Sequence, residues 1–192
     1  MATDRTQTGK GRYHPLAHKF TDSVDFISAS FGKIADIFVL AACAISAGNA
    51  VIRYLFNTSS NAWLEAQWYL FAGMVMLGAA HTLRKNEHVR VDIVYGIVSA
   101  RTRLWIDIVG TIVFLLPVCA IMGWMTWRFF FDAFSHHEIS ANAGGLLRWP
   151  VKFVMPLGFA LLVLQGLAEL VKRIIALDGE KDATPEYERP LQ

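Results

Sequence analysis

The stretch that decides the fold is residues 79–92, AAHTLRKNEHVRVD, where apolar sequence gives way to charged sequence. The run before it is long and apolar, whereas the charged side chains that begin at Arg84 cannot lie in hydrocarbon. The following segment, residues 89–100, alternates apolar and polar faces and is too short to cross a bilayer. We therefore predict a loop at a membrane surface, followed by a helix that lies along that surface over residues 89–100.

The composition also indicates a membrane protein. Of the 192 residues, 54% are apolar and only 18% are charged, and the charges are clustered. The six tryptophans lie mostly near the ends of apolar runs, which is typical of interfacial anchors. A formal net charge of +2 is too small to suggest binding of nucleic acid. The N-terminal segment has no apolar core next to its basic residues, so we expect no cleaved signal peptide.

Four apolar runs are long enough to cross a bilayer, so the predicted fold class is an all-α membrane protein with four transmembrane helices and an amphipathic surface helix. Residues 1–33 are predicted to form a tail and an amphipathic lead-in on the membrane surface, and residues 173–192 a second tail. Pro117 cannot donate a backbone hydrogen bond, which predicts a kink in the third run. The predicted spans are residues 34–53, 62–83, 104–127 and 150–171.

The distribution of basic residues predicts the orientation. Of the 18 Lys and Arg residues, fourteen lie in the N-terminal segment, in residues 84–103 and in the C-terminal tail, whereas the other two loops hold four. Cytoplasmic loops of membrane proteins are enriched in Lys and Arg. Both termini and the middle loop are therefore predicted to be cytoplasmic.

Carboxylates in these runs are predicted to be structural. A carrier that binds its own substrate usually has ionisable groups near the middle of the membrane, whereas Asp36, Asp107 and Glu169 fall near predicted cytoplasmic helix ends. There we expect them to pair with cations and set the helix register. Glu65 is interpreted as a partner for the positive end of its helix. The candidate cations are Lys33, Arg84, Arg101, Arg103 and Lys172.

No catalytic residue, cofactor or metal is predicted. A membrane cytochrome needs axial histidines within its helices, and the one histidine inside an apolar run, His81, lies near the end of that run. The adjacent residues 136–138, HHE, point in different directions and lack the spacing of metal ligands. Cys43 and Cys119 are interpreted as small buried side chains. From the residues alone, we predict a small membrane protein that supports a partner.

Three blocks of sequence resemble a known family. The first is GAAH at 78–81 with Arg84 and HVRVD at 88–92. The others are SANAGGL at 140–146 with RWPVK at 148–152, and PLGF at 156–159 with QG at 165–166 and Glu169. On these blocks, residues 31–173 resemble the small membrane subunit (Q-type, DctQ-like) of the tripartite ATP-independent periplasmic, or TRAP, transporters. The later blocks resemble the branch labelled for mannitol or chloroaromatic compounds.

The resemblance implies a complex in the bacterial inner membrane. A periplasmic substrate-binding protein would capture a small organic acid, and a large membrane permease subunit would carry it across, driven by sodium. The small subunit would enlarge the fixed scaffold of the permease, without binding substrate or sodium. One alternative is a membrane-anchor subunit of an oxidoreductase complex, and another is a self-sufficient small exporter.

The resemblance also suggests which residues make contacts. We expect the surface helix to brace the scaffold, and residues 57–63 and 132–147 to face the periplasmic protein. The candidates for partner or scaffold contacts are Arg84, His88, Arg90, Asp92, Ile93, Ile97, Asn142 and Arg148. The candidates for interfacial anchors or contacts with membrane lipids are Trp63, Trp68, Trp105, Trp124, Trp127 and Trp149.

Overall fold

A computed structural model of the chain describes residues 15–58, 60–86, 98–142 and 144–177. Within these ranges every named element is helical, and one isolated β-bridge joins Ile139 and Leu147. The predicted all-α class is therefore confirmed. The elements are α1 (Pro15–Phe56), α2 (Asn61–Lys85), α4 (Ala100–Gly110), the π-helical turn η1 (Thr111–Leu115), α5 (Leu116–Ser135) and α6 (Trp149–Leu177).

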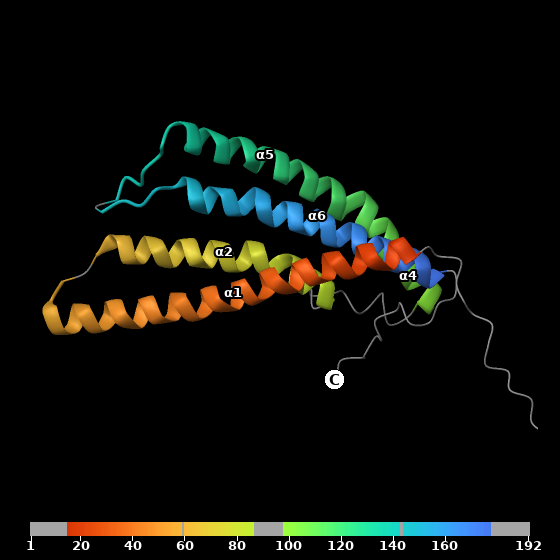
Figure 1. Cartoon of the computed structure of the whole chain (residues 1–192), viewed down its shortest axis with the longest axis horizontal. Coiled ribbons are helices and arrows are strands. Elements are labelled where there is room, and N and C mark those ends of the chain that lie inside the picture. The colour runs from red at the N-terminus through yellow and green to blue at the C-terminus, as the bar shows by residue number, and fades with distance from the viewer. Residues whose placement is uncertain (1–14, 59, 87–97, 143, 178–192) are drawn as a thin grey trace, which may run out of the picture.

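The helices form two hairpins that pack side by side. One hairpin pairs α1 with α2 and the other pairs α5 with α6 (Figure 1). Between the hairpins, α6 packs mainly on α2 and also contacts α1. The start of α1, the start of α4 and the end of α6 lie at one end of the bundle, which we call the terminal end (Figure 1). The α1–α2 turn and the α5–α6 loop lie at the opposite end, the loop end.

The first helix is longer than predicted. The sequence predicts a separate lead-in before the first span, whereas α1 is one helix of 42 residues, about 63 Å long. The helix continues because its buried positions recur every three to seven residues without a break and pack on the bundle. These buried residues are Thr21, Val24, Ser28, Gly32, Ala35 and Ala42.

Three helices in the described residues are long and apolar enough to cross a membrane. They are α1, the continuous helix Ala100–Ser135 and α6. The predicted second span corresponds to α2, whose 25 residues suffice in length. Glu65, Gln67 and His81 lower its apolar character, so α2 is not among the three.

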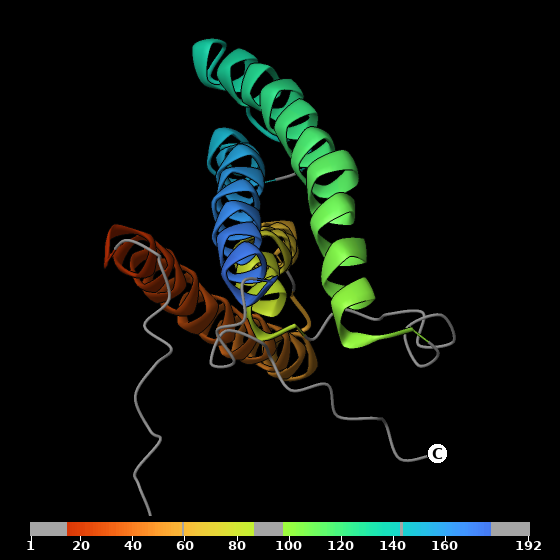
Figure 2. The same cartoon turned by 90° about the vertical axis from the view of Figure 1, so that its right-hand side faces the viewer.

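The helix Ala100–Ser135 is curved, and a π-helical turn interrupts it close to the proline at which a kink is predicted. The π-helical turn, η1, ends two residues before Pro117, and Figure 2 shows the curvature of this helix along its length. A proline and a π-helical turn both disturb the regular hydrogen-bond ladder, which allows bending. The predicted surface helix, residues 89–100, lies outside the described residues except for its last three, of which Ala100 begins α4.

Small residues bring the helices into close contact. The buried core contains Leu77, Ala80 and Leu161. A Cβ atom added at Gly158 would lie 2.8 Å from the backbone oxygen of Met76, so α6 and α2 approach nearly backbone to backbone there. At Gly73 an added Cβ would lie 2.4 Å from the ring of Phe38.

This contact predicts that Gly158→Ala destabilises the bundle. We expect a loss of about 1–3 kcal/mol, because the rigid backbone of α2 cannot yield to the added methyl group. Thermal unfolding of the purified chain in detergent measures the effect. The matched control is Gly110→Ala, where no atom lies within 4 Å of the added Cβ. A melting temperature equal to that of the control would contradict the prediction.

Candidate functional site

Glu65 connects α2 to the loop between α5 and α6 at the loop end. Its side chain is buried, and Oε1 accepts hydrogen bonds from Ser140 Oγ and, at 2.7 Å, from Asn142 Nδ2. Oε2 accepts the backbone N–H of Leu146 at 3.0 Å. Three donors satisfy this carboxylate, which is the condition for burying a charge without a large penalty.

The sequence-based interpretation of Glu65 is wrong. Glu65 is the fifth residue of α2, beyond the first turn that a carboxylate must occupy to complement a helix N-terminus. Two features of the sequence could have indicated the contact between Glu65 and the loop. One is a lone carboxylate at the start of an apolar run, and the other is a distant segment, residues 140–146, that is rich in small and hydrogen-bonding residues.

Two glycines give the loop its shape. Gly144 has a φ of +78°, a conformation that favours glycine, and a Cβ at Gly145 would lie 2.3 Å from the carbonyl oxygen of Ser140. Backbone hydrogen bonds close the loop from Ser140 N to Leu146 O and from Arg148 N to Glu138 O. The closed loop places three donors around Glu65.

Glu138 fastens the loop to the start of α6. Its Oε1 pairs with Arg148 Nη1 at 3.2 Å, and its Oε2 pairs with Lys152 Nζ. The hydrogen bond from Lys152 holds the pKa of Glu138 below its ordinary value of 4.5, and Arg148 acts in the same direction against partial desolvation. The Lys152 ammonium also lies 3.8 Å from the centre of the Phe129 ring.

The Glu138 pairs predict how stability depends on pH. A lowered pKa in the folded state adds stability above the unfolded value near 4.5, and this contribution is lost as pH falls through the folded-state pKa. Wild type should therefore melt at a higher temperature than Glu138→Gln at pH 7, and the difference should shrink below pH 4.5. Thermal melting across pH tests this. Asp132→Asn, which removes an exposed carboxylate from the same end, is the control.

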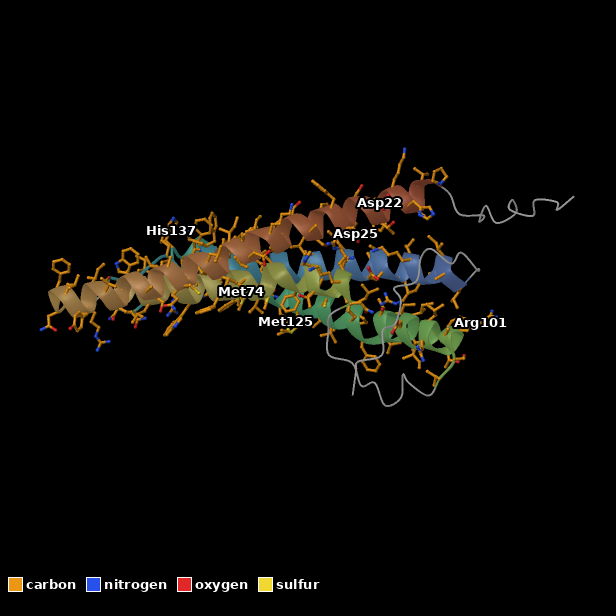
Figure 3. All side chains as sticks on the ribbon, turned by 90° about the horizontal axis from the view of Figure 1, so that it is seen from below. Asp22, Asp25, Met74, Arg101, Met125 and His137 are labelled. Carbon is orange, nitrogen blue, oxygen red and sulfur yellow. The ribbon has the colours of Figure 1, made fainter. Side chains whose placement is uncertain are left out.

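A second cluster of charges joins α1 to α6 at the terminal end. Lys172 Nζ donates to both carboxylate oxygens of Asp25, at 2.9 and 2.8 Å, and to Glu169 Oε1 at 2.9 Å. Gln165 Nε2 also donates to Asp25, and Gln165 Oε1 accepts from Ser28 Oγ at 2.6 Å. Asp25 lies where α1 passes over α6 (Figure 3).

Arg173 extends this terminal cluster to α4. Its Nε donates to Asp107 at 3.0 Å and its Nη1 donates to Glu169 at 3.2 Å. The expected pairing of Asp107 and Glu169 with cations is therefore confirmed, and both bind Arg173, which the sequence did not suggest as a partner. The sequence also missed Asp25, in a segment read as a surface lead-in.

The predicted contact residues divide into three groups. Asn142 and Arg148 lie in the α5–α6 loop and bind Glu65 and Glu138 within the chain, and Arg84 lies half-buried at the end of α2. Five candidates lie outside the described residues. They are His88, Arg90, Asp92, Ile93 and Ile97.

Most of the tryptophans are exposed on the outside of the helices. Trp149 is half-buried and packs edge-on against Phe134, with ring centres 5.6 Å apart. The other five are exposed, namely Trp63, Trp68, Trp105, Trp124 and Trp127. Among the described residues, no group of three His, Cys, Asp or Glu side chains is placed to hold a metal ion.

Comparison with known proteins identifies the family. The model of the family described as "Tripartite ATP-independent periplasmic transporters, DctQ component" matches residues 31–176. This chain belongs to the DctQ family. The match includes Glu65, Glu138 and Glu169, whereas Asp25 and Ser28 lie before it.

One similar protein is the "C4-dicarboxylate TRAP transporter small permease protein DctQ" of Vibrio cholerae serotype O1. The two are 29% identical over 122 residues, which cover 62% of this chain and 50% of that protein. This chain therefore spans about half the length of the curated relative it matches. No solved structure matches the chain.

Membership of the DctQ family confirms the predicted resemblance to the small membrane subunit of TRAP transporters. The chain is a DctQ-like TRAP small membrane subunit, a multi-pass protein of the bacterial inner membrane and a component of a transporter. A family of transporter components points away from an enzyme, and it does not favour the alternative of an oxidoreductase anchor.

Proposed function

We propose that this DctQ-family chain is the scaffold subunit of a sodium-driven secondary transporter for small organic acids. A large permease subunit carries the substrate, a periplasmic binding protein delivers it, and this chain supports the permease. Family membership implies such a complex in general.

The observation that carries the scaffold role is that charged side chains fasten the helices to one another at both ends. Glu65 and Glu138 hold the loop end, and Asp25, Glu169 and Arg173 take part in the terminal cluster. Packed apolar side chains, among them Leu77 and Leu161, occupy the bundle between them. A bundle braced at both ends is suited to holding a partner in place.

The topology we propose has four spans, with α2 as the fourth and both termini in the cytoplasm. Apolar contacts with α1 and α6 shield one side of α2, so it tolerates a less apolar sequence than a helix surrounded by lipid. The terminal end would then be cytoplasmic, in keeping with the distribution of Lys and Arg. The α5–α6 loop would face the periplasm and meet the binding protein.

Transport by the reconstituted complex tests the proposal. Proteoliposomes containing the permease and this chain, with binding protein, substrate and an inward sodium gradient, should take up substrate. Omission of any one protein should reduce uptake to background. Uptake supported by this chain alone, or full uptake without it, would contradict the scaffold role.

The surface helix allows a separate prediction. The double substitution Ile93→Lys with Ile97→Lys should lower the yield of the complex with the permease severalfold, because both residues lie on the predicted apolar face. Tyr95→Lys, on the opposite predicted face, is the control. Co-purification measures the yield, and an unchanged yield would remove this helix from the scaffold.

A further inference from the structure

A stripe of polar side chains lies on the half of α1 next to the loop end. Ser46, Asn49 and Arg53 are spaced by three and four residues, so they share one face of the helix. Together with Ala50, Tyr54 and Asn57 they line a shallow groove of about 550 Å³. The last fully buried residue of α1 is Ala42, and in the part beyond it Ser46 and Arg53 are exposed and Asn49 is half-buried.

These three side chains have no partner within the described chain. The hydrogen bonds and ion pairs among the described residues include none from the side chains of Ser46, Asn49 or Arg53. Other helical hydroxyl groups bond to their own helix, such as Ser30 Oγ to the Phe26 carbonyl at 2.9 Å. The stripe therefore offers an unused hydroxyl group, an amide group and a guanidinium group on one face.

Depth distinguishes the possible occupants of the groove. Arg53 lies one turn from the end of α1 and can extend to the lipid phosphates. In the proposed topology, Asn49 lies about 6 Å and Ser46 about 10 Å further along the helix axis toward the membrane interior. This is the level of acyl chains, which cannot form hydrogen bonds. A protein helix presents polar groups at all three levels, and a carboxylate on it complements the charge of Arg53.

We propose that the Ser46–Asn49–Arg53 stripe is the docking surface for a membrane-spanning helix of the large permease subunit. That helix places a carboxylate against Arg53 and hydrogen-bonding side chains against Asn49 and Ser46. The small side chains of Ser46 and Ala50, four residues apart, allow the two helices to approach closely. This inference rests on the proposed function, because it names the surface through which the scaffold holds the permease.

A second exposed arginine provides a matched control. Arg128 lies on α5, also toward the loop end, and lines a groove of about 630 Å³ with Trp124, Trp127 and Phe131. The described residues offer no ion-pair partner to its guanidinium group. Asp132 and Ser135 also line this groove, but both have partners within the chain, since Asp132 pairs with His136 and Ser135 Oγ donates to the Asp132 carbonyl. The other neighbours are large aromatic side chains, which suit a lipid interface.

The test is recovery of the permease with the tagged chain after co-expression of the two subunits. The permease is identified by immunoblot, and bound phospholipid is counted by mass spectrometry. We expect Arg53→Glu to lower recovery about tenfold, because it sets two carboxylates against each other. The double substitution Ser46→Leu with Asn49→Leu should also lower it, whereas Arg53→Lys should retain most of the permease and Arg128→Glu should leave recovery unchanged.

Several outcomes would overturn the inference. Recovery unchanged in both Arg53→Glu and the double variant would exclude the stripe as the contact, and an equal loss with Arg128→Glu would show a general effect of charge. Loss of bound phospholipid with the permease retained would assign the stripe to a lipid. Absence of the permease from the wild-type preparation would instead contradict the proposed function, and the inference with it. Arg53→Gln is a milder variant, because it removes the positive charge without reversing it. Gel filtration of each variant alone distinguishes misfolding from loss of binding to the permease.

Discussion

Glu65→Ala frees the α5–α6 loop and lowers the melting temperature of the purified chain by several degrees. The substitution leaves Ser140 Oγ, Asn142 Nδ2 and the backbone N–H of Leu146 without their acceptor. Unsatisfied donors in a buried site destabilise a fold more than the loss of an ordinary hydrogen bond. Glu65→Gln should share part of this loss, because an amide nitrogen cannot accept the N–H of Leu146.

Hydrogen exchange at the Leu146 amide gives a local measure of the same effect. We expect exchange to be much faster in Glu65→Ala than in wild type, with amides in the middle of α6 less affected. The control is Asp132→Asn, an exposed carboxylate at the same end of the bundle. If the Leu146 amide exchanges at the wild-type rate in Glu65→Ala, this carboxylate does not organise the loop. If the reconstituted transporter with Glu65→Ala loses uptake of substrate, the loop is linked to delivery of the substrate.

Arg173→Met is the second substitution with a large expected effect. It leaves Asp107 on α4 and the buried Glu169 on α6 without the cation they share. Removing one partner of a buried ion pair typically costs about 3–5 kcal/mol when the remaining charge is uncompensated. Glu169 keeps its pair with Lys172, so we expect a loss near the lower end of this range. Thermal unfolding in detergent should therefore show a large loss of stability.

Neutralising the two carboxylates that bind Arg173 separates the effect of charge from the effect of packing. Combining Arg173→Met with Asp107→Asn and Glu169→Gln should recover much of the stability, since no unpaired charge then remains at this position. Arg101→Met, at an exposed position on α4 (Figure 3), is the control for loss of an arginine. A melting temperature for Arg173→Met equal to that of Arg101→Met would show that the ion pairs do not stabilise the bundle.

The two clusters show how far the candidate site was predictable. The sequence indicated that Asp107 and Glu169 would pair with cations, because both are carboxylates near helix ends in apolar surroundings. The sequence did not indicate Arg173 as the cation that Asp107 and Glu169 share. It also did not indicate that Asp25 forms an ion pair with Lys172. Asp25 and Lys172 are 147 residues apart in the chain, and their contact depends on how α1 and α6 cross.

The sequence by itself determined the helical class, the approximate positions of α2, α5 and α6, the membrane setting and the family. These follow from properties of contiguous residues, namely the length of apolar runs, the placement of Lys and Arg, and short blocks that resemble the family. Only the tertiary structure decided that α1 is one long helix packed on the bundle, that Glu65 organises a loop 75 residues away, and that the Ser46–Asn49–Arg53 stripe is left without an internal partner. The physical reason is that hydrophobicity is carried by each segment, whereas hydrogen bonds and ion pairs require two segments to meet in a specific rotation and register.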